Sequence, residues 1–275
     1  MSRFLSLAVE LVVHGLLIIC VFSNSIASQE VTKHFIYSEL TMIKLISFKN
    51  CPFVQRVMGA LVSKNIPFEI EYIELSNKPQ WFLDISPNGQ VPVLITEDET
   101  VLFESDAIVE YLDDKYAPIE QVSAEQKALD RAWSYQASKH YMAQCGTMGS
   151  KDQETFEARL AKLSKSFAKA ENKLGDSAFF KGSTISNVDI AWLPILHRAD
   201  VIKRCSGFDM LDGFPKVQKW QAALIESGLA DKTVPDDFVN SFSNFYLKNT
   251  YLASLVAGAV INGKASCCAT DSCCA

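Results

Sequence analysis

The chain has 275 residues, of which 48% are hydrophobic and 21% are charged. This length suits one large domain or two of moderate size, and the composition excludes disorder, collagen and low complexity for most of the chain. Lys and Arg total 26 against 32 Asp and Glu, a net charge of -6, so the chain carries no electrostatic footprint for DNA or RNA.

The first 41 residues differ in character from the rest. An apolar run covers residues 4–22, and small residues suited to signal peptidase follow it. Three interpretations of residues 1–41 stay open: a cleaved signal peptide, a membrane anchor, or sequence upstream of a true start at Met42. Glu10 weakens both membrane interpretations, because a carboxylate inside a bilayer is costly. We expect membrane contact only if residues 4–22 are retained as an anchor.

The eight cysteines form no disulfide framework. Half of them fall in the last nine residues, and the others are scattered over nearly two hundred positions. A reducing compartment, and therefore a cytoplasmic protein, is the simpler interpretation, with export or anchoring through residues 4–22 as the alternative. Residues 251–275 are expected to form a Cys-rich tail, of which the last part, KASCCATDSCCA, is detachable. The spacing of its cysteines does not match a zinc site, so we expect no metal. These tail cysteines are Cys267, Cys268, Cys273 and Cys274.

Residues 42–117 alternate between strand and helix patterns. The expected strands are 43–48, 68–75, 91–95 and 100–103, and the expected helices are 52–65, 78–86 and 104–116. A β-α-β opening implies parallel strands with a right-handed crossover, and the last two strands are close enough for an antiparallel hairpin. The order βαβαββα therefore predicts an α/β thioredoxin-like domain, with helices on both faces of a four-stranded mixed sheet.

Strand patterns stop after a short linker at residues 118–123. Residues 124–250 are expected to form an all-α helical bundle domain with helices at 124–148, 152–175, 187–203 and 214–228. Ser186 followed by Asp189 is an acidic version of the capping box and marks the start of the third of these helices.

Cys51 is placed for chemistry. It follows the first strand and precedes Pro52, a residue favoured in the first turn of a helix. Free backbone N–H groups and the helix dipole favour a thiolate there, and Lys49 and Arg56 are candidates to add positive potential. The alternative is a buried structural cysteine. Val54 stands where a dithiol motif has its second cysteine, so a disulfide on Cys51 needs an external thiol such as glutathione.

Two further features suit an amino-acid ligand. A proline that opens a strand opposite the reactive cysteine predicts a cis peptide at Val91-Pro92, which turns the Val91 backbone toward the cleft. Ser105 and the free N–H groups at its helix start suit a carboxylate, and Glu104 suits an ammonium group. The alternatives are an ordinary strand-initiating proline and simple helix capping.

Together these stretches resemble the glutathione transferase superfamily, and within it most closely the cysteine-type omega class. The resemblance covers roughly residues 43–230. Its motifs are NCPFVQR (50–56), NKPQWF (77–82), SPNGQVPVL (86–94), ESDAIVEYLDDKY (104–116) and ISNVDIAW (185–192).

The resemblance implies five glutathione-binding residues. By motif, Lys78 contacts the glycine carboxylate of glutathione. Val91 pairs through its backbone with the cysteinyl unit, beside cis Pro92. Glu104 and Ser105 hold the γ-glutamyl group.

The resemblance also implies an activity. It makes Cys51 the catalytic thiol of a glutathione-dependent thiol transferase, with glutathione as co-substrate and no metal. The expected reactions are thiol-disulfide exchange, deglutathionylation, dehydroascorbate-type reduction and some conjugation of electrophiles. Its expected partners are small electrophilic or disulfide substrates and a second copy of the chain, in a homodimer. Two alternatives stay open: a chloride intracellular channel-like protein that inserts into membranes, and a non-catalytic scaffold that binds a partner protein.

Overall fold

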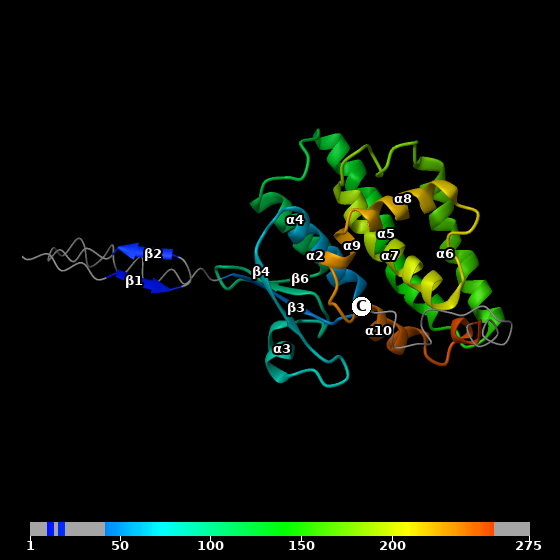
Figure 1. Cartoon of the computed structure of the whole chain (residues 1–275), viewed down its shortest axis with the longest axis horizontal. Coiled ribbons are helices and arrows are strands. Elements are labelled where there is room, and N and C mark those ends of the chain that lie inside the picture. Colours follow the sequence, from blue (N-terminus) through cyan, green and yellow to red (C-terminus); the bar gives the residue numbers. More distant parts are fainter. Residues whose placement is uncertain (1–9, 14–15, 20–41, 256–275) are drawn as a thin grey trace, which may run out of the picture. The chain divides into compact units, whose positions relative to one another are not determined.

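The computed structural model describes residues 10–13, 16–19 and 42–255, and the chain divides into two compact units, Met1–Thr41 and Met42–Ala275 (Figure 1). In the first unit β1 (Glu10–Val13) pairs antiparallel with β2 (Leu16–Ile19). The rest of the leader and residues 256–275, with the four tail cysteines, lie outside the described residues, so their interpretations stay predictions. Residues 251–255, predicted as the start of the tail, are instead helical, and Leu252 is buried in the core of the helical domain. No helix that the structure describes is both long enough and apolar enough to cross a membrane.

The second unit begins with the mixed sheet that the sequence predicts. Its strands are β3 (Ile43–Ser47), β4 (Phe68–Tyr72), β5 (Val93–Ile95) and β6 (Val101–Phe103), in the spatial order β4-β3-β5-β6. β3 runs parallel to β4, and β5 is antiparallel to both β3 and β6. At the centre, Leu45 faces Ile70 on one side and Leu94 on the other. The βαβαββα topology is therefore confirmed.

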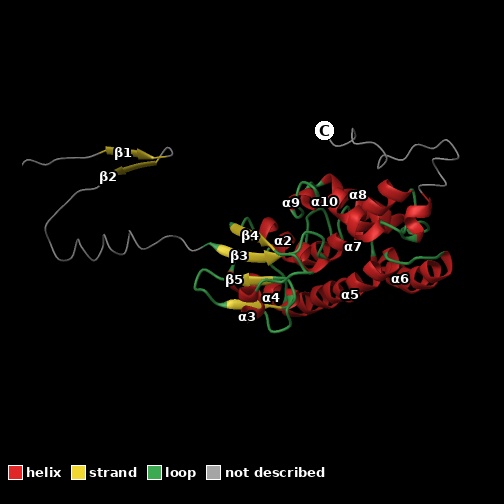
Figure 2. Ribbon diagram, turned by 90° about the horizontal axis from the view of Figure 1, so that it is seen from below, coloured by secondary structure: helices red, strands yellow, loops and turns green. Residues whose placement is uncertain are grey.

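Helices cover both faces of this sheet (Figures 1 and 2). They are α2 (Pro52–Ser63), α3 (Gln80–Ile85) and α4 (Ser105–Lys115). Successive side chains of a strand point to opposite faces. Leu45 therefore packs in a core with Val57 of α2 and Leu112 of α4, whereas Ile46 packs against Phe82 of α3 on the other face.

An all-helical bundle follows. It contains α5 (Ala124–Met148), α6 (Gln153–Lys173), α7 (Asn187–Ser206) and α8 (Pro215–Glu226), so the four expected helices are confirmed. The short elements α9 (Leu229–Lys232), α10 (Phe238–Phe242) and the π-helix η1 (Ser243–Leu247) were not predicted. Asp189 accepts hydrogen bonds from the Ser186 backbone at 2.8 Å and from its hydroxyl at 2.5 Å, which confirms the capping box.

The bundle meets the sheet domain where α7 packs on α2. Nearly all of α7 is buried, and it contacts α5, α2 and α8. The two helices approach so closely at Gly59 that a Cβ atom there would lie 2.8 Å from Cγ2 of Ile190. This contact matters for the site because Cys51 is the N-cap of α2, so α7 of the second domain packs against the helix that follows the candidate thiol.

Candidate functional site

Cys51 occupies the position that the sequence predicts. It is the N-cap of α2 with an extended backbone (φ -78°, ψ 120°), and Pro52 fills the first turn. The residue as a whole is partly exposed, and its Sγ lies 3.9 Å from the carbonyl oxygen of Val91. The Val91-Pro92 peptide is cis, as predicted.

The prediction of a lowered pKa at Cys51 is wrong. Burial is the largest influence and raises the pKa of this thiol to about 11. The backbone N–H groups of Val54 and Phe53 oppose it, as expected at a helix N-terminus, and so does the charge of Arg198. Removal of water from around a thiolate therefore outweighs the favourable dipole in this structure.

The two cations proposed for this site face other partners. Lys49 pairs with Asp237 at 2.7 Å, and Arg56 pairs with Asp106 of α4. Neither is among the groups that shift the pKa of Cys51. The two cations that the sequence predicted therefore do not act on the Cys51 thiol.

Arg198 of α7 supplies the positive charge instead. Its side chain is fully buried, with a guanidinium Nη2 donating to the carbonyl oxygen of Asn50 at 3.0 Å and Nη1 donating to Oε1 of Gln55. Nη1 also donates to the carbonyl oxygen of Pro194 at 3.1 Å. These bonds hold the guanidinium against the first turn of α2. Arg198 was not predicted because it lies in the other domain, and α7 carries other charged residues from which the local sequence does not distinguish it.

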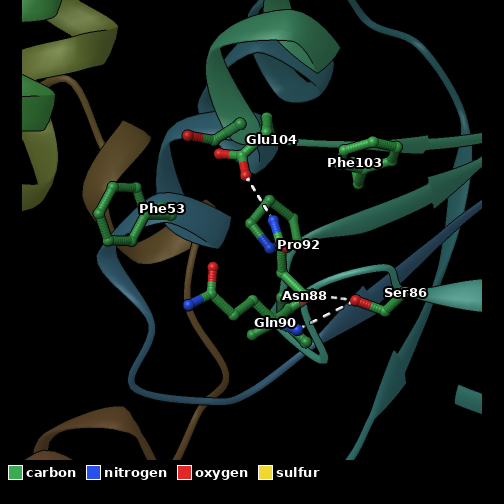
Figure 3. Close-up of a pocket in the computed structure, with 9 residues that line it drawn as sticks. Phe53, Ser86, Asn88, Gln90, Pro92, Phe103 and Glu104 are labelled. Carbon is green, nitrogen blue, oxygen red and sulfur yellow. Dashed lines mark hydrogen bonds between the residues drawn. The ribbon is translucent and has the colours of Figure 1, made fainter. Parts of the chain in front are cut away.

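Figure 3 shows a pocket whose lining includes Phe53, Pro92 and Glu104. Cys51 is not a lining residue; it reaches the pocket through Val91, which lines it and whose carbonyl oxygen lies 3.9 Å from Sγ of Cys51. The pocket holds about 420 Å³ of space, part of it open to solvent. The structure brings four of the predicted binding residues together in its lining, namely Val91, Pro92, Glu104 and Ser105. Five further lining residues were missed by the sequence analysis: Phe53, Ser86, Asn88, Gln90 and Phe103.

Polar groups organise this pocket. Glu104 has a positive φ of 67°, a sparsely populated conformation that tends to occur at functional sites. Its carboxylate accepts a hydrogen bond from Nδ2 of Asn88 at 3.2 Å, and Ser86 and Gln90 bond to each other across the same turn (Figure 3). Ser105 begins α4 and is buried. An ammonium group and a carboxylate would thus both find complementary groups here.

Lys78 is not among the residues that line the pocket. It lies in the loop before α3 and is half-buried. A Cβ atom on Gly89 would be 3.7 Å from its Nζ, so the ammonium group lies near the turn that contributes Asn88 and Gln90. Among the described residues, no group of three or more His, Cys, Asp or Glu side chains could hold a metal ion.

Comparison with known proteins identifies the family. Residues 50–115 match the model of the glutathione S-transferase N-terminal domain, and residues 118–227 match that of the C-terminal domain. Glutathione S-transferase omega-1 of Rattus norvegicus is 31% identical over 193 residues, which are 68% of this chain and 78% of the rat protein. The chain belongs to the glutathione transferase superfamily. Both the family and the thioredoxin-like fold inferred from the motifs are thereby confirmed.

Other relatives of this glutathione transferase support the same placement. A rice protein named probable glutathione S-transferase DHAR2, chloroplastic, is 31% identical over 189 residues, which are 67% of this chain but only 65% of the rice protein. Rice GST1 in complex with glutathione superimposes with a TM-score of 0.64 at 25% identity, covering 76% of this chain and 99% of the rice chain. Glutathione transferase Omega 3C from Trametes versicolor has a TM-score of 0.62 at 24% identity, covers 77% and 96% of the two chains, and supports the fold alone.

Proposed function

We propose that this glutathione transferase is a thiol transferase in which Cys51 is the nucleophile and the pocket beside it binds glutathione. The observation that carries the proposal is Cys51 at the start of α2, with its sulfur 3.9 Å from the carbonyl oxygen of Val91, which lines the pocket. The omega-class relative and the solved rice complex with glutathione support the choice of ligand.

The reaction has two exchange steps. The Cys51 thiolate attacks the glutathione sulfur of a mixed disulfide, which forms a Cys51–glutathione disulfide and releases the substrate thiolate, which takes up a proton. The thiolate of a second glutathione then attacks the glutathione sulfur of this disulfide. Oxidised glutathione leaves, and the Cys51 thiolate is restored. Glutathione supplies both electrons, so no metal takes part in the scheme.

The pocket would orient glutathione through its charged ends. Glu104 faces the ammonium group and Ser105, with the N-terminus of α4, faces the γ-glutamyl carboxylate. The Val91 backbone lies beside the cysteinyl unit, and Lys78 is the proposed partner of the glycine carboxylate. We also propose a cytoplasmic homodimer. The names of two rice relatives, one cytosolic and one chloroplastic, are consistent with either compartment.

One observation favours a second candidate function. A thiol with a pKa of about 11 is ionised in only about one molecule in ten thousand at pH 7. A non-catalytic protein that binds glutathione or a partner would tolerate such a thiol, whereas a thiol transferase needs part of it as thiolate. The two candidates differ in whether turnover depends on Cys51.

The test is glutathione-dependent reduction of a glutathionylated peptide by the full chain. Cys51→Ser should reduce turnover at least about 100-fold, because the covalent intermediate cannot form. Cys205→Ser is the matched control, since Cys205 is a buried cysteine of α7 away from the pocket, and it should leave turnover unchanged. Equal turnover in Cys51→Ser and the wild type contradicts the proposal, and glutathione binding without turnover in the wild type favours the non-catalytic function.

A further inference from the structure

Arg198 is a buried cation without an anionic partner. No carboxylate of the described residues lies within 4.0 Å of its guanidinium, and its Nε has no hydrogen-bond acceptor among them. Its acceptors are neutral oxygens: two backbone carbonyls and the amide of Gln55. The ring of Phe238 also faces the guanidinium, with its centroid 5.5 Å from Cζ. Such a charge is costly to bury, so the fold retains it at an energetic disadvantage.

The groups that face Arg198 could become anions but are neutral near pH 7. Besides Cys51 of α2, they are Tyr141 and Cys145 of α5 and Tyr246 of η1. Burial raises the pKa of each of these three above its ordinary value. From α7 itself, burial and then Arg198 lower the pKa of His197 to about 3, so this imidazole is neutral as well. Arg198 keeps its proton in protein interiors and is therefore the charged member of this cluster.

A rigid network orients the guanidinium. Gln55 accepts from Arg198 through Oε1, while its Nε2 lies 2.9 Å from Nδ1 of His197 and donates to Oγ1 of Thr233 at 3.1 Å. Because the amide nitrogen donates, Nδ1 of His197 accepts and the imidazole carries its proton on Nε2. A buried dipole network of this kind fixes the position of a charge before any reaction begins.

We propose that Arg198 is a positioning residue for the thiol chemistry: its unpaired guanidinium, held by Gln55 against the first turn of α2, is the counter-charge of the Cys51 thiolate. The inference rests on the proposed function, because it concerns the same sulfur. Cys51 is an anion twice in the scheme, as attacking group and as leaving group. Arg198 favours both states, since a less basic thiolate is more abundant and also leaves faster.

The test measures alkylation of Cys51 by iodoacetamide between pH 6 and 9, using mass spectrometry of the peptide that contains Cys51. Three variants of the full chain remove, neutralise or retain the positive charge at position 198. Arg198→Met removes it. Gln55→Glu leaves Arg198 in place but gives it a carboxylate partner of nearly the same shape. Arg198→Lys keeps a positive charge. Arg204→Gln is the matched control, because it removes the same charge from an exposed turn of α7.

We expect Arg198→Met and Gln55→Glu each to raise the Cys51 pKa by about one unit. The thiolate fraction then falls tenfold at each pH. The more basic thiolate is also more nucleophilic, which offsets part of the resulting loss in alkylation rate. The alkylation rate should fall about three- to fourfold. Arg198→Lys should keep most of the wild-type rate, and Arg204→Gln all of it. Thermal melts verify folding, and Gln55→Glu answers the question if Arg198→Met does not fold.

Two results overturn the inference. One is a wild-type alkylation rate in Gln55→Glu, which would mean that the field of Arg198 does not reach the sulfur. The other is an equal fall in Arg204→Gln, which would mean that net charge alone matters. Alkylation by iodoacetamide needs no glutathione, so the outcome is independent of the turnover assay. A shifted alkylation rate without peptide reduction would retain the role of Arg198 and reject the proposed function.

Discussion

Two neighbouring residues of α2, Gln55 and Arg56, face two different electrostatic environments. Arg56 has a side chain that is only 4% exposed, and its charge is paired with Asp106, whose side chain is 43% exposed to water. Gln55 contacts Arg198, which is equally buried but has only neutral acceptors. Arg56, the paired arginine, joins α2 to α4 within one domain. Arg198, the unpaired one, joins the two domains, and its positive charge acts on the Cys51 thiol. Burial alone therefore does not decide whether an arginine is structural or electrostatic; its partner does.

The largest expected effect is that acid destabilises the network around Arg198, because this network contains His197. The pKa of His197 is about 3 in the folded chain because of burial, and about 6.5 when unfolded. Between these values the unfolded chain binds the extra proton, so stability is present above pH 6.5 and is lost as the pH falls. The loss is about 1.4 kcal/mol per pH unit, or about 2.5 kcal/mol by pH 4.5.

Urea unfolding followed by tryptophan fluorescence at pH 7 and pH 4.5 measures this loss. His197→Gln cannot titrate, so the fall in its free energy of unfolding should be smaller than in the wild type by about 2 kcal/mol. Parallel losses in the two proteins would show that His197 is not held neutral by the network around Gln55.

Removing the paired arginine should affect stability without affecting the thiol. Arg56→Met removes the buried member of this ion pair, and the remaining Asp106 is exposed enough to be hydrated. We expect the free energy of unfolding to fall by about 2 kcal/mol, less than when a buried charge is left unpaired. The alkylation rate of Cys51 should stay at the wild-type value. A fall as large as in Arg198→Met would show that the two arginines do not differ in their effect on the sulfur.

Arg198 reaches the start of α2 because α7 packs closely on α2. This close packing can be tested at Gly59. Gly59→Ala gains up to about 1 kcal/mol of helix propensity, but its Cβ would meet Cγ2 of Ile190 at 2.8 Å. Overpacking of this kind costs about 1–3 kcal/mol, so we expect a net loss of about 1 kcal/mol in the free energy of unfolding.

A double-mutant cycle isolates this contact. In an Ile190→Ala background, Gly59→Ala should become neutral or stabilising, because the obstructing methyl group is gone. Gly146→Ala in α5 is the control: beyond the adjacent residues and the backbone of its own helix, no atom of the described residues lies within 4 Å of its Cβ position, so only the gain in propensity should remain. A destabilising Gly59→Ala in both backgrounds would place the strain elsewhere.

The sequence predicted those features of the fold that depend on local patterns. Short strand-like runs, one of them with period-two alternation at 68–75, identified the four strands of the sheet. Helical spacing identified α5, which begins and ends at the predicted residues. The short elements after α8 were missed because α9 and α10 span only four and five residues, too few for a period to show.

At the site, local chemistry was predictable and desolvation was not. The helix start at Cys51 and the cis Pro92 follow from neighbouring residues, and both are present. The sign of the Cys51 pKa shift depends on how tightly the rest of the chain encloses the sulfur, which no local motif records. Arg198 was missed for the same reason, since only packing of α7 on α2 brings it to the thiol.

The position of Arg198 means that one domain encodes the sulfur while the other encodes its charge environment. Successive residues of an α-helix are rotated by about 100°, so insertion of a single residue near the start of α7 would carry the guanidinium away from α2. If the helical domain were exchanged between family members, the new domain would therefore change the charge environment of the sulfur as well as the substrate contacts. A chimera would take this electrostatic part of the Cys51 environment from the donor of the helical domain.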